Sequence, residues 1–109
     1  MRVLVTGGAG FVGSNLVDRL INDGNDVVII DNLSSGKKEN INPKAEFHEV
    51  DICDLHIKGL CSMFEGVDVV FHTAALARVQ PSIDDPVQFD KVNVGGTLNV
   101  LKASVDYGV

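Results

Sequence analysis

A glycine-rich stretch near the N-terminus, VTGGAGFVGSN (residues 5–15), constrains the fold of this chain more than any other segment. It follows RVLVT (2–6), a β-branched run typical of a strand that is buried on both faces. It leads into residues 11–22, where apolar side chains recur at helical spacing until Asp23 and Gly24 end the pattern. A strand, a tight turn and a helix in this order indicate the first unit of a parallel α/β sheet.

Later hydrophobic runs predict three further strands, at residues 26–31, 46–50 and 67–74. Because helical or turn-rich segments separate these runs, we expect a parallel sheet with right-handed connections and helices on its faces. The predicted strand order is 3-2-1-4, the first half of a Rossmann-type α/β fold. The fourth strand would then be an unprotected edge. We therefore expect residues 1–109 to be the N-terminal portion of a larger domain.

Two more helices are predicted after the third strand. A short one covers residues 55–64 (LHIKGLCSMF), with Asp54 as its N-cap. A long one runs from Pro86 to about Tyr107, after a predicted loop at residues 78–86. The long helix carries an apolar stripe made up of Val87, Val94, Leu98, Leu101 and Val105.

Charge and cysteine content narrow the possible partners. The chain has 109 residues, a formal net charge of −6 and a pI near 4.8. Nucleic acids and anionic membranes attract basic surfaces, so neither is expected as the main partner. No apolar run approaches the ~20 residues of a membrane span, and no signal sequence is recognised. Cys53 and Cys61 match no metal or redox spacing. We therefore expect a cytoplasmic domain without a metal site.

The glycines of the turn can be read in two registers. Gly8, Gly10 and Gly13 spell GxGxxG, whereas Gly7, Gly10 and Gly13 spell GxxGxxG. In either register, glycine lets the backbone approach a diphosphate, whose charge is stabilised by the first free N–H groups of the helix. The preceding strand and the following helix are the context that such a motif requires. The pattern predicts a phosphate-binding turn and leaves the register open.

Asp31 closes the second predicted strand. A carboxylate at this place accepts hydrogen bonds from both hydroxyls of an adenosine ribose and repels a 2′-phosphate, which favours NAD over NADP. Two alternatives stay open. Asp31 can instead form the turn in DNLSSG, and Lys37 and Lys38 can offer positive charge to an NADP phosphate.

Asp51 and Ile52 follow the third predicted strand, where an adenine ring would lie. The carboxylate can accept from an exocyclic amine while the aliphatic side chain covers the ring. A capping role for the aspartate is an equal alternative. Ala74 and Ala75, after the fourth strand, are small enough for the rest of a cofactor to pass close to the backbone.

Two polar residues near the fourth strand have both a chemical and a structural interpretation. His72 can be a general base, but a histidine inside an apolar strand end is more often a packing residue with its hydrogen bonds satisfied. Arg78 can contact an anion, and an ordinary surface position is equally consistent with its sequence context.

Several segments together resemble a known family. TGGAGFVGS, DNLSSG, VDICD, FHTAA and NVGGTLNVLKAS occur in an order and spacing similar to the extended short-chain dehydrogenases/reductases, in particular the NAD-dependent sugar-nucleotide epimerases and dehydratases. The resemblance covers essentially the whole chain. It implies NAD as cofactor, a nucleotide-sugar substrate and a homodimeric parent enzyme, and it selects the register of Gly7, Gly10 and Gly13.

The resemblance also implies cofactor-binding residues, most of them at strand ends. Phe11 and Val12 would donate backbone N–H groups to the diphosphate, and Asn93 would brace the region after the fourth strand. The implied set is Gly7, Gly10, Phe11, Val12, Gly13, Asp31, Asn32, Ser35, Gly36, Asp51, Ile52, Ala74, Ala75, Leu76 and Asn93.

In this family a Ser or Thr and a Tyr-x-x-x-Lys pair, all beyond a fifth strand, carry the chemistry. Residues 1–109 contain no such pair, and Tyr107 has no residue four positions later. We therefore expect no catalytic residue and no substrate domain in residues 1–109, and a chain that binds NAD weakly and is inactive alone.

The activity implied for the parent is removal and return of a hydride at C4 of a nucleotide-linked hexose. A 4,6-dehydratase, a decarboxylase or a reductase of the same family would share this first half, so these branches stay open. A non-catalytic NAD-binding module, with its sheet edge protected by a partner, is a third alternative.

Overall fold

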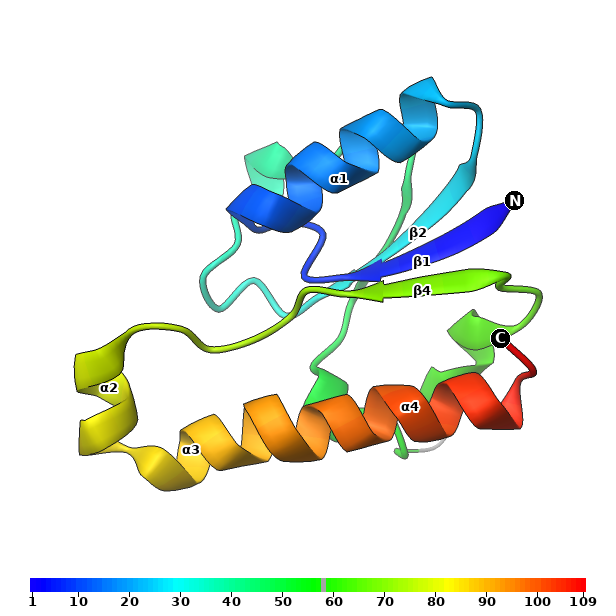
Figure 1. The fold of residues 1–109 in the computed structure, drawn as a ribbon. Coiled ribbons are helices and arrows are strands. Elements are labelled where there is room, and N and C mark those ends of the chain that lie inside the picture. The colour runs from blue at the N-terminus through cyan, green and yellow to red at the C-terminus, as the bar shows by residue number, and fades with distance from the viewer. Residues whose placement is uncertain (58) are drawn as a thin grey trace.

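The computed structural model describes residues 1–57 and 59–109, which form a four-stranded parallel sheet (Figure 1). The strands are β1 (Arg2–Thr6), β2 (Asp26–Asp31), β3 (Glu46–Glu49) and β4 (Val69–His72). Their order is β3-β2-β1-β4. The predicted fold class, a Rossmann-type α/β sheet with the order 3-2-1-4, is confirmed.

Strand β1 lies in the middle of the sheet. It pairs with β2 as far as Thr6↔Ile30 and with β4 as far as Thr6↔His72. Every side chain of β1 after Arg2 is buried, as expected for an apolar strand covered on both faces. This register places Thr6 beside His72 at the carboxyl end of the sheet.

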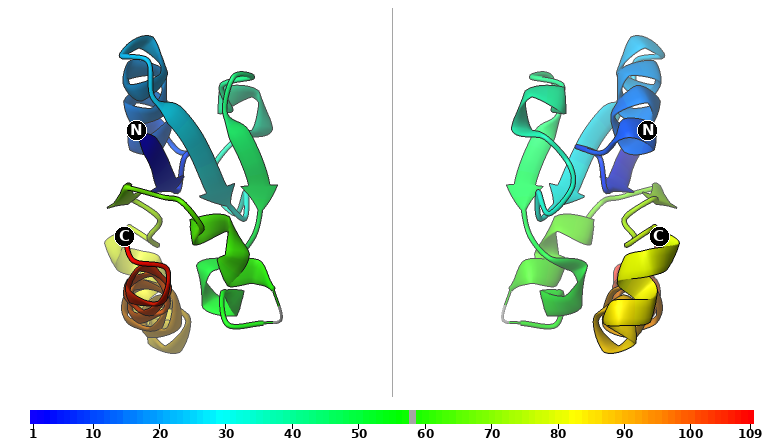
Figure 2. Two further views of the ribbon diagram at one scale, coloured as in Figure 1. Left: turned by 90° about the vertical axis from the view of Figure 1, so that its right-hand side faces the viewer. Right: turned by 90° about the vertical axis from the view of Figure 1, so that its left-hand side faces the viewer.

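Helical segments cover both faces of the sheet, as Figures 1 and 2 show. Helix α1 (Phe11–Asn22) covers one face through Val17, which packs with buried valines and an isoleucine of β1 and β2. The other face is covered by α4 (Thr97–Asp106) and by the short helices η2 (Ile52–Asp54) and η3 (Leu60–Phe64). Phe64, Val100 and Ala103 are among the buried residues of this second layer.

The predicted short helix at residues 55–64 is wrong. The 3₁₀ turn η2 ends before this segment, only η3 is helical among its described residues, and Gly59 has φ +80° directly before η3. A left-handed residue interrupts an α-helix, so the apolar spacing does not continue as one. Asp54 accordingly lies inside η2 rather than at the N-cap of a helix. Residue 58 of the predicted helix lies outside the described residues.

The segment after β4 also differs from the prediction. Part of the predicted loop at 78–86 is a short helix, α2 (Val79–Asp84). The long helix is present from Pro86 to Asp106, but it consists of α3 (Pro86–Asp90), a π-helical stretch η4 (Lys91–Gly96) and α4. A further 3₁₀ turn, η1 (Lys38–Asn40), lies between β2 and β3.

The apolar stripe of the long helix faces away from the sheet. Its members are 59% to 77% exposed, whereas Val92, Gly96, Val100 and Ala103 of the same helix are buried. Apolar spacing identified the helix correctly, but it did not identify the buried face. None of the helices in residues 1–57 and 59–109 is long and apolar enough to cross a membrane.

Candidate functional site

The turn after β1 depends on glycine for both conformation and space. Gly7 has φ +74°, and a Cβ there would lie 2.8 Å from the backbone N of Ala74. A Cβ on Gly13 would lie 2.1 Å from the carbonyl O of Gly7. Both distances are far below van der Waals contact, so only glycine lets the turn approach Ala74 at position 7 and lets helix α1 pack on the turn at position 13.

Gly8 and Gly10 differ in what surrounds them. A Cβ on Gly8 would lie 2.6 Å from Cγ2 of the buried Ile29, whereas a Cβ on Gly10 would meet only the Gly7 O, at 3.4 Å. The fold itself therefore requires Gly7, Gly8 and Gly13. Gly10 is the glycine of the motif whose missing side chain leaves open space, which is where an approaching diphosphate needs it.

Helix α1 presents its N-terminus to this space. Gly10 is the N-cap, and no side chain caps the helix. The N–H groups of the first turn, including those of Phe11 and Val12, have no acceptor inside the helix and carry its partial positive charge. Phe11 and Val12 are 84% and 66% exposed, so their side chains are not packed over these N–H groups.

Asp31, at the end of β2, is 8% exposed and holds the turn in place. Its Oδ2 accepts from the N–H of Ala9 at 3.0 Å, and its Oδ1 accepts from the N–H of Leu33 at 2.7 Å. A carboxylate has about four acceptor positions. The two backbone bonds therefore leave capacity for a pair of ligand hydroxyls.

The loop after Asp31 packs against the turn. A Cβ on Gly36 would lie 2.9 Å from the backbone of Ala9, and Lys37 donates its backbone N–H to the Ala9 carbonyl at 3.1 Å. Lys37 and Lys38 are exposed, and neither lines the cleft described below. This placement favours the alternative of solvated lysines over that of a phosphate contact.

Asp51 has the capping role considered for it, and its adenine contact stays a prediction. Its Oδ1 caps η2 by accepting from the N–H of Cys53 at 2.8 Å, and its Oδ2 accepts from Nδ2 of Asn32 at 3.1 Å. Partial burial raises the pKa of the Asp51 carboxyl, but these hydrogen bonds outweigh burial and hold the pKa below its ordinary value. The adjoining Ile52 is buried against Gly96, where a Cβ would lie 2.5 Å from Cδ1 of Ile52.

The segment after β4 is fixed at both ends. Ala74 donates its N–H to the hydroxyl of Thr6 at 3.1 Å. Leu76 is held by Asn93 through two bonds, from the Leu76 N–H to Oδ1 at 2.8 Å and from Nδ2 to the Leu76 carbonyl at 2.9 Å. Asn93 lies in the π-helical stretch, so this irregular turn meets the strand end through one side chain.

His72 lies between hydroxyl groups of two elements. Its Nδ1 is 2.7 Å from Oγ1 of Thr6, and its Nε2 is 2.9 Å from Oγ1 of Thr97. Burial lowers the pKa of the imidazole. Because both ring nitrogens already have partners, the arrangement favours the packing interpretation over a general base. Arg78 is exposed, with φ +92°, and does not line the cleft.

These elements surround one open cleft at the carboxyl edge of the sheet. Its volume is about 670 Å³, the open solvent at its mouth included. It brings together most of the residues implied by the family resemblance: Gly7, Gly10, Asp31, Asn32, Ser35, Gly36, Asp51, Ile52, Ala74, Ala75 and Leu76.

The other four implied residues do not line the cleft. Phe11, Val12 and Gly13 form the first turn of the adjoining helix, and Asn93 acts from behind Leu76. Sequence reasoning also missed cleft residues, namely Ile30, Ser34, Val50, Thr73, Gln88 and Val92. Thr73 follows a strand end, which is a usable signal. Gln88 and Val92 reach the cleft only because the long helix passes beside it. Among the described residues, no group of His, Cys, Asp and Glu is arranged to hold a metal ion.

The sheet order and the glycine turn define the class of protein, an α/β dinucleotide-binding domain with its cleft at the carboxyl ends of the strands. Residues 3–109 match the model of the NAD dependent epimerase/dehydratase family, and the chain belongs to this family. NAD is therefore the cofactor. The residues present fit it, since the turn is open at Gly10 and Asp31 has unused acceptor capacity.

Known relatives share both the sequence and the fold. The UDP-glucose 4-epimerase of Mycolicibacterium smegmatis is 47% identical over 114 residues, covering 100% of this chain and 36% of the relative. UDP-glucuronic acid decarboxylase 1 of Arabidopsis thaliana is 42% identical, covering 93% of this chain and 23% of the relative. The Thermus thermophilus UDP-glucose 4-epimerase, solved as a complex with NAD, superposes with a TM-score of 0.91 at 45% identity and covers 100% of this chain and 35% of that one. The chain thus spans about a third of the length of the epimerases it matches.

Proposed function

We propose that this chain is the N-terminal, NAD-binding portion of a nucleotide-sugar epimerase of the UDP-glucose 4-epimerase type. The observation that carries the proposal is the cleft, in which the glycine turn, Asp31 and the 74–76 segment converge within a chain that matches the family over residues 3–109. The identity of 47% with a UDP-glucose 4-epimerase supports the particular branch.

Each part of the cleft has a role in this proposal. The backbone N–H groups of Phe11 and Val12 bind the diphosphate, which passes over Gly10. Asp31 accepts from the adenosine ribose hydroxyls, and the loop from Asn32 to Gly36 closes around that ribose. When bound, NAD supplies the chemistry of hydride removal and return at C4 of the sugar.

The residues that would hold the two ends of NAD follow β3 and β4, on opposite sides of β1. Asp51 and Ile52 line the adenine side, where hydrogen bonds from Asn32 and Cys53 already orient the Asp51 carboxylate. Ala74, Ala75 and Leu76 bound the other side, and Asn93 holds them in place. Their small or aliphatic side chains leave the backbone of this segment accessible to a ligand.

Catalysis and sugar recognition belong to residues outside this chain in the proposal. The expected Ser or Thr, Tyr and Lys follow a fifth strand, which would pair with the exposed edge of β4. Phe71 on β4 is 38% exposed, as expected for a strand that lacks its next neighbour. Cys53 and Cys61 are free thiols, which suits a parent enzyme of the cytoplasm.

The parent is proposed to be a homodimer. The exposed stripe of the long helix supports this part, because Val94, Leu98, Leu101 and Val105 follow each other at intervals of four, three and four residues, the spacing of a helix–helix seam. Replacing Leu98 and Leu101 by lysine should convert the dimer to monomers in sedimentation analysis of the whole protein. A dimer that withstands both changes would contradict this assignment.

A decarboxylase branch is the second candidate. The identity of 42% with a UDP-glucuronic acid decarboxylase favours it, and the family description covers dehydratases as well. Incubating the whole protein with UDP-glucose and, separately, with UDP-glucuronic acid separates the branches. UDP-galactose formation supports the epimerase, whereas release of CO₂ from the uronic acid supports the decarboxylase.

Calorimetric titration of the chain with NAD and with NADP tests the cofactor site. We expect NAD to bind and NADP to bind at least tenfold more weakly, because Asp31 repels the 2′-phosphate, a difference of about 1.4 kcal/mol. Asp31→Asn, which keeps the acceptor oxygen but not the charge, should narrow this preference, and Asp18→Asn on helix α1 is the matched surface control. Tighter binding of NADP would refute the assignment of Asp31. Epimerase turnover by the 109-residue chain alone would refute its proposed inactivity.

A further inference from the structure

Thr6, His72 and Thr97 form a continuous chain of hydrogen bonds behind the cleft. Thr6 is on the central strand β1, His72 is at the end of β4, and Thr97 is the first residue of α4. The imidazole joins the two hydroxyls, at 2.7 Å from Thr6 Oγ1 and 2.9 Å from Thr97 Oγ1. None of these three side chains was assigned a role in cofactor binding by the sequence, and none lines the cleft.

The partners of the two threonines determine where the protons lie. Thr97 Oγ1 is 2.6 Å from the carbonyl O of Asn93, which can only accept, so the Thr97 hydroxyl donates to it. Thr97 Oγ1 must then accept from His72, which places the ring proton on Nε2. The unprotonated Nδ1 accepts from the Thr6 hydroxyl. The lone pairs of Thr6 Oγ1 are in turn taken by the N–H groups of Thr73 and Ala74, each at 3.1 Å.

The two ends of this chain hold the two ends of one cleft segment. At one end, Thr6 accepts from the N–H of Ala74. At the other, Thr97 donates to the carbonyl of Asn93, and the Asn93 side chain makes both bonds to Leu76. The imidazole is thus the element that joins the two anchors of residues 74–76. No polar side-chain atom in residues 1–57 and 59–109 is buried without a hydrogen-bond partner, so this network is complete.

We infer that His72 is a positioning residue for the cofactor, which as a neutral Nε2–H imidazole couples Thr6 to Thr97 and so holds the 74–76 wall of the cleft in its binding geometry. The inference rests on the proposed cofactor site. It assigns no proton transfer to His72, since both ring nitrogens are engaged by the protein. It also predicts that a substitution at Thr97, which does not line the cleft, changes the affinity for NAD.

The first test measures the proton positions. Nitrogen-15 NMR of the histidine rings, recorded on the whole protein near pH 7.5, should show for His72 one protonated nitrogen, Nε2, and one unprotonated nitrogen, Nδ1. His72→Gln identifies the resonances by their loss. A proton on Nδ1, or a charged imidazolium, would overturn the assignment, because Thr6 Oγ1 has no lone pair left to accept a further N–H.

The second test measures NAD affinity and unfolding temperature of conservative pairs. Thr97→Val should weaken NAD binding roughly fivefold to tenfold, the effect of one lost buried hydrogen bond, whereas Thr97→Ser should stay within about twofold. Thr6→Val and Thr6→Ser should behave in the same way. The effects of Thr6→Val and Thr97→Val on the free energy of NAD binding should be non-additive when His72 is present. They should be additive in the His72→Phe background.

The outcomes separate the inference from the cofactor proposal. A wild-type protein that does not bind NAD refutes the proposed site and, with it, the role of His72. A wild-type protein that binds NAD, with variants that lower the unfolding temperature but leave NAD affinity unchanged, refutes the positioning role alone. Weaker binding for both valine variants, restored by serine and coupled through His72, is the supporting result.

Discussion

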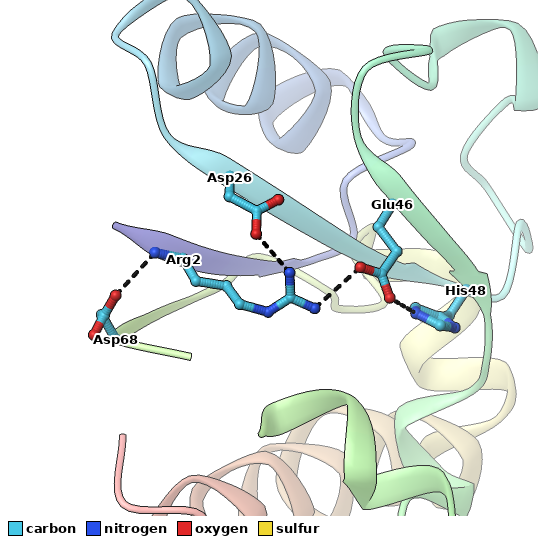
Figure 3. Close-up of polar contacts among 5 residues, drawn as sticks. All are labelled: Arg2, Asp26, Glu46, His48 and Asp68. Carbon is cyan, nitrogen blue, oxygen red and sulfur yellow. Dashed lines mark hydrogen bonds and ion pairs between the residues drawn. The ribbon is translucent and has the colours of Figure 1, made fainter. Parts of the chain in front are cut away.

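The two ends of the parallel sheet are stabilised in different ways. At the carboxyl end, backbone segments approach each other so closely that only glycine fits at Gly7 and Gly13, and neutral hydrogen bonds join β1, β4 and the long helix. At the amino end, Arg2 donates to Asp26 at 2.6 Å and to Glu46 at 3.0 Å, across three neighbouring strands (Figure 3).

The charged cluster at the amino end extends beyond the arginine. His48 is 2.8 Å from the second oxygen of Glu46, and the backbone N–H of Arg2 donates to Asp68 at 2.8 Å (Figure 3). The side chains of Asp26 and Glu46 are 64% and 48% exposed. Solvent therefore competes with each of these contacts, and each contributes little.

The comparison shows where this sheet tolerates change. A single atom added at Gly7 or Gly13 disturbs packing contacts that nothing else can replace, whereas water replaces a lost ion pair at the amino end. We therefore expect the cofactor end to be sensitive to small neutral substitutions and the opposite end to be insensitive even to loss of charge.

The largest expected effect is that of Gly13→Ala. The new Cβ would lie 2.1 Å from the Gly7 carbonyl, so α1 must shift away from the turn, at a cost of about 3 kcal/mol in the free energy of unfolding. Urea denaturation of the whole protein measures it. Gly95→Ala is the control, since a Cβ there meets nothing within 4 Å and should stabilise the helix by about 0.5 kcal/mol. Equal effects at the two glycines would contradict the close-approach argument.

The second effect is that of Gly10→Val, which distinguishes space needed by a ligand from space needed by the packing of the protein. A Cβ on Gly10 meets only the Gly7 carbonyl, at 3.4 Å, and Gly10 has extended backbone angles that any residue adopts. Gly10→Val should therefore leave the free energy of unfolding within about 0.5 kcal/mol. It should weaken NAD binding about a hundredfold, since its side chain occupies the proposed diphosphate path. A loss of stability as large as that of Gly13→Ala would mean that Gly10 serves the fold.

The third effect is a pH dependence of stability that His72 at the carboxyl end produces. Burial lowers the pKa of His72 below its ordinary value of 6.5, so the unfolded chain binds this proton more readily than the folded one. The stabilisation by neutral His72 is complete above pH 6.5 and is lost as the pH falls through the lowered pKa. Between pH 7.5 and pH 5, the free energy of unfolding should fall less for His72→Gln than for the wild type, as measured by urea denaturation at each pH. Parallel declines would exclude His72 as the cause.

The smallest effect is expected at the amino end. Arg2→Gln removes both ion pairs and should lower the free energy of unfolding by roughly 0.5–1 kcal/mol. This loss should be smaller in 1 M salt, which screens the pairs in the wild type. The bonds from His48 and then Arg2 lower the pKa of Glu46 below its ordinary value of 4.5. The contribution of Glu46 is therefore present above pH 4.5 and is lost as the pH falls through the lowered pKa. Arg19→Gln, which removes the exposed pair with Asp23, is the control and should cost less still.

Much of the fold follows from local patterns. Strands β1, β2 and β4 were predictable because β-branched runs of four to six residues end at polar or glycine residues, and parallel connections have one hand. That only Leu60–Phe64 among the described residues of the predicted helix at 55–64 is helical was not predictable, because the interruption depends on the left-handed conformation of Gly59. Helix α2 was missed because RVQPSIDDP has the composition of a loop.

Part of the candidate site could likewise be predicted from the sequence, and part could not. Residues adjoining strand ends, such as Asp31, Asp51 and Ala74, were identified because every strand of a parallel sheet opens toward the same edge. Gln88 and Val92 were missed because they are distant in sequence from any strand end. The exposed stripe and the buried face of the long helix were also beyond sequence reasoning, because both sets of residues recur at helical spacing.

The sequence alone determined the parallel sheet, its order and the place of the glycine-rich turn, because these follow from short-range patterning and from the conformations open to glycine. Only the tertiary structure decided which glycines serve the fold and which one leaves space for a ligand, since this depends on atoms of Ile29 and Ala74 that are far away in the chain. It also decided the direction of the bonds around His72. A proton's position depends on the partners of both ring nitrogens, and these partners meet only when β1, β4 and α4 are packed together.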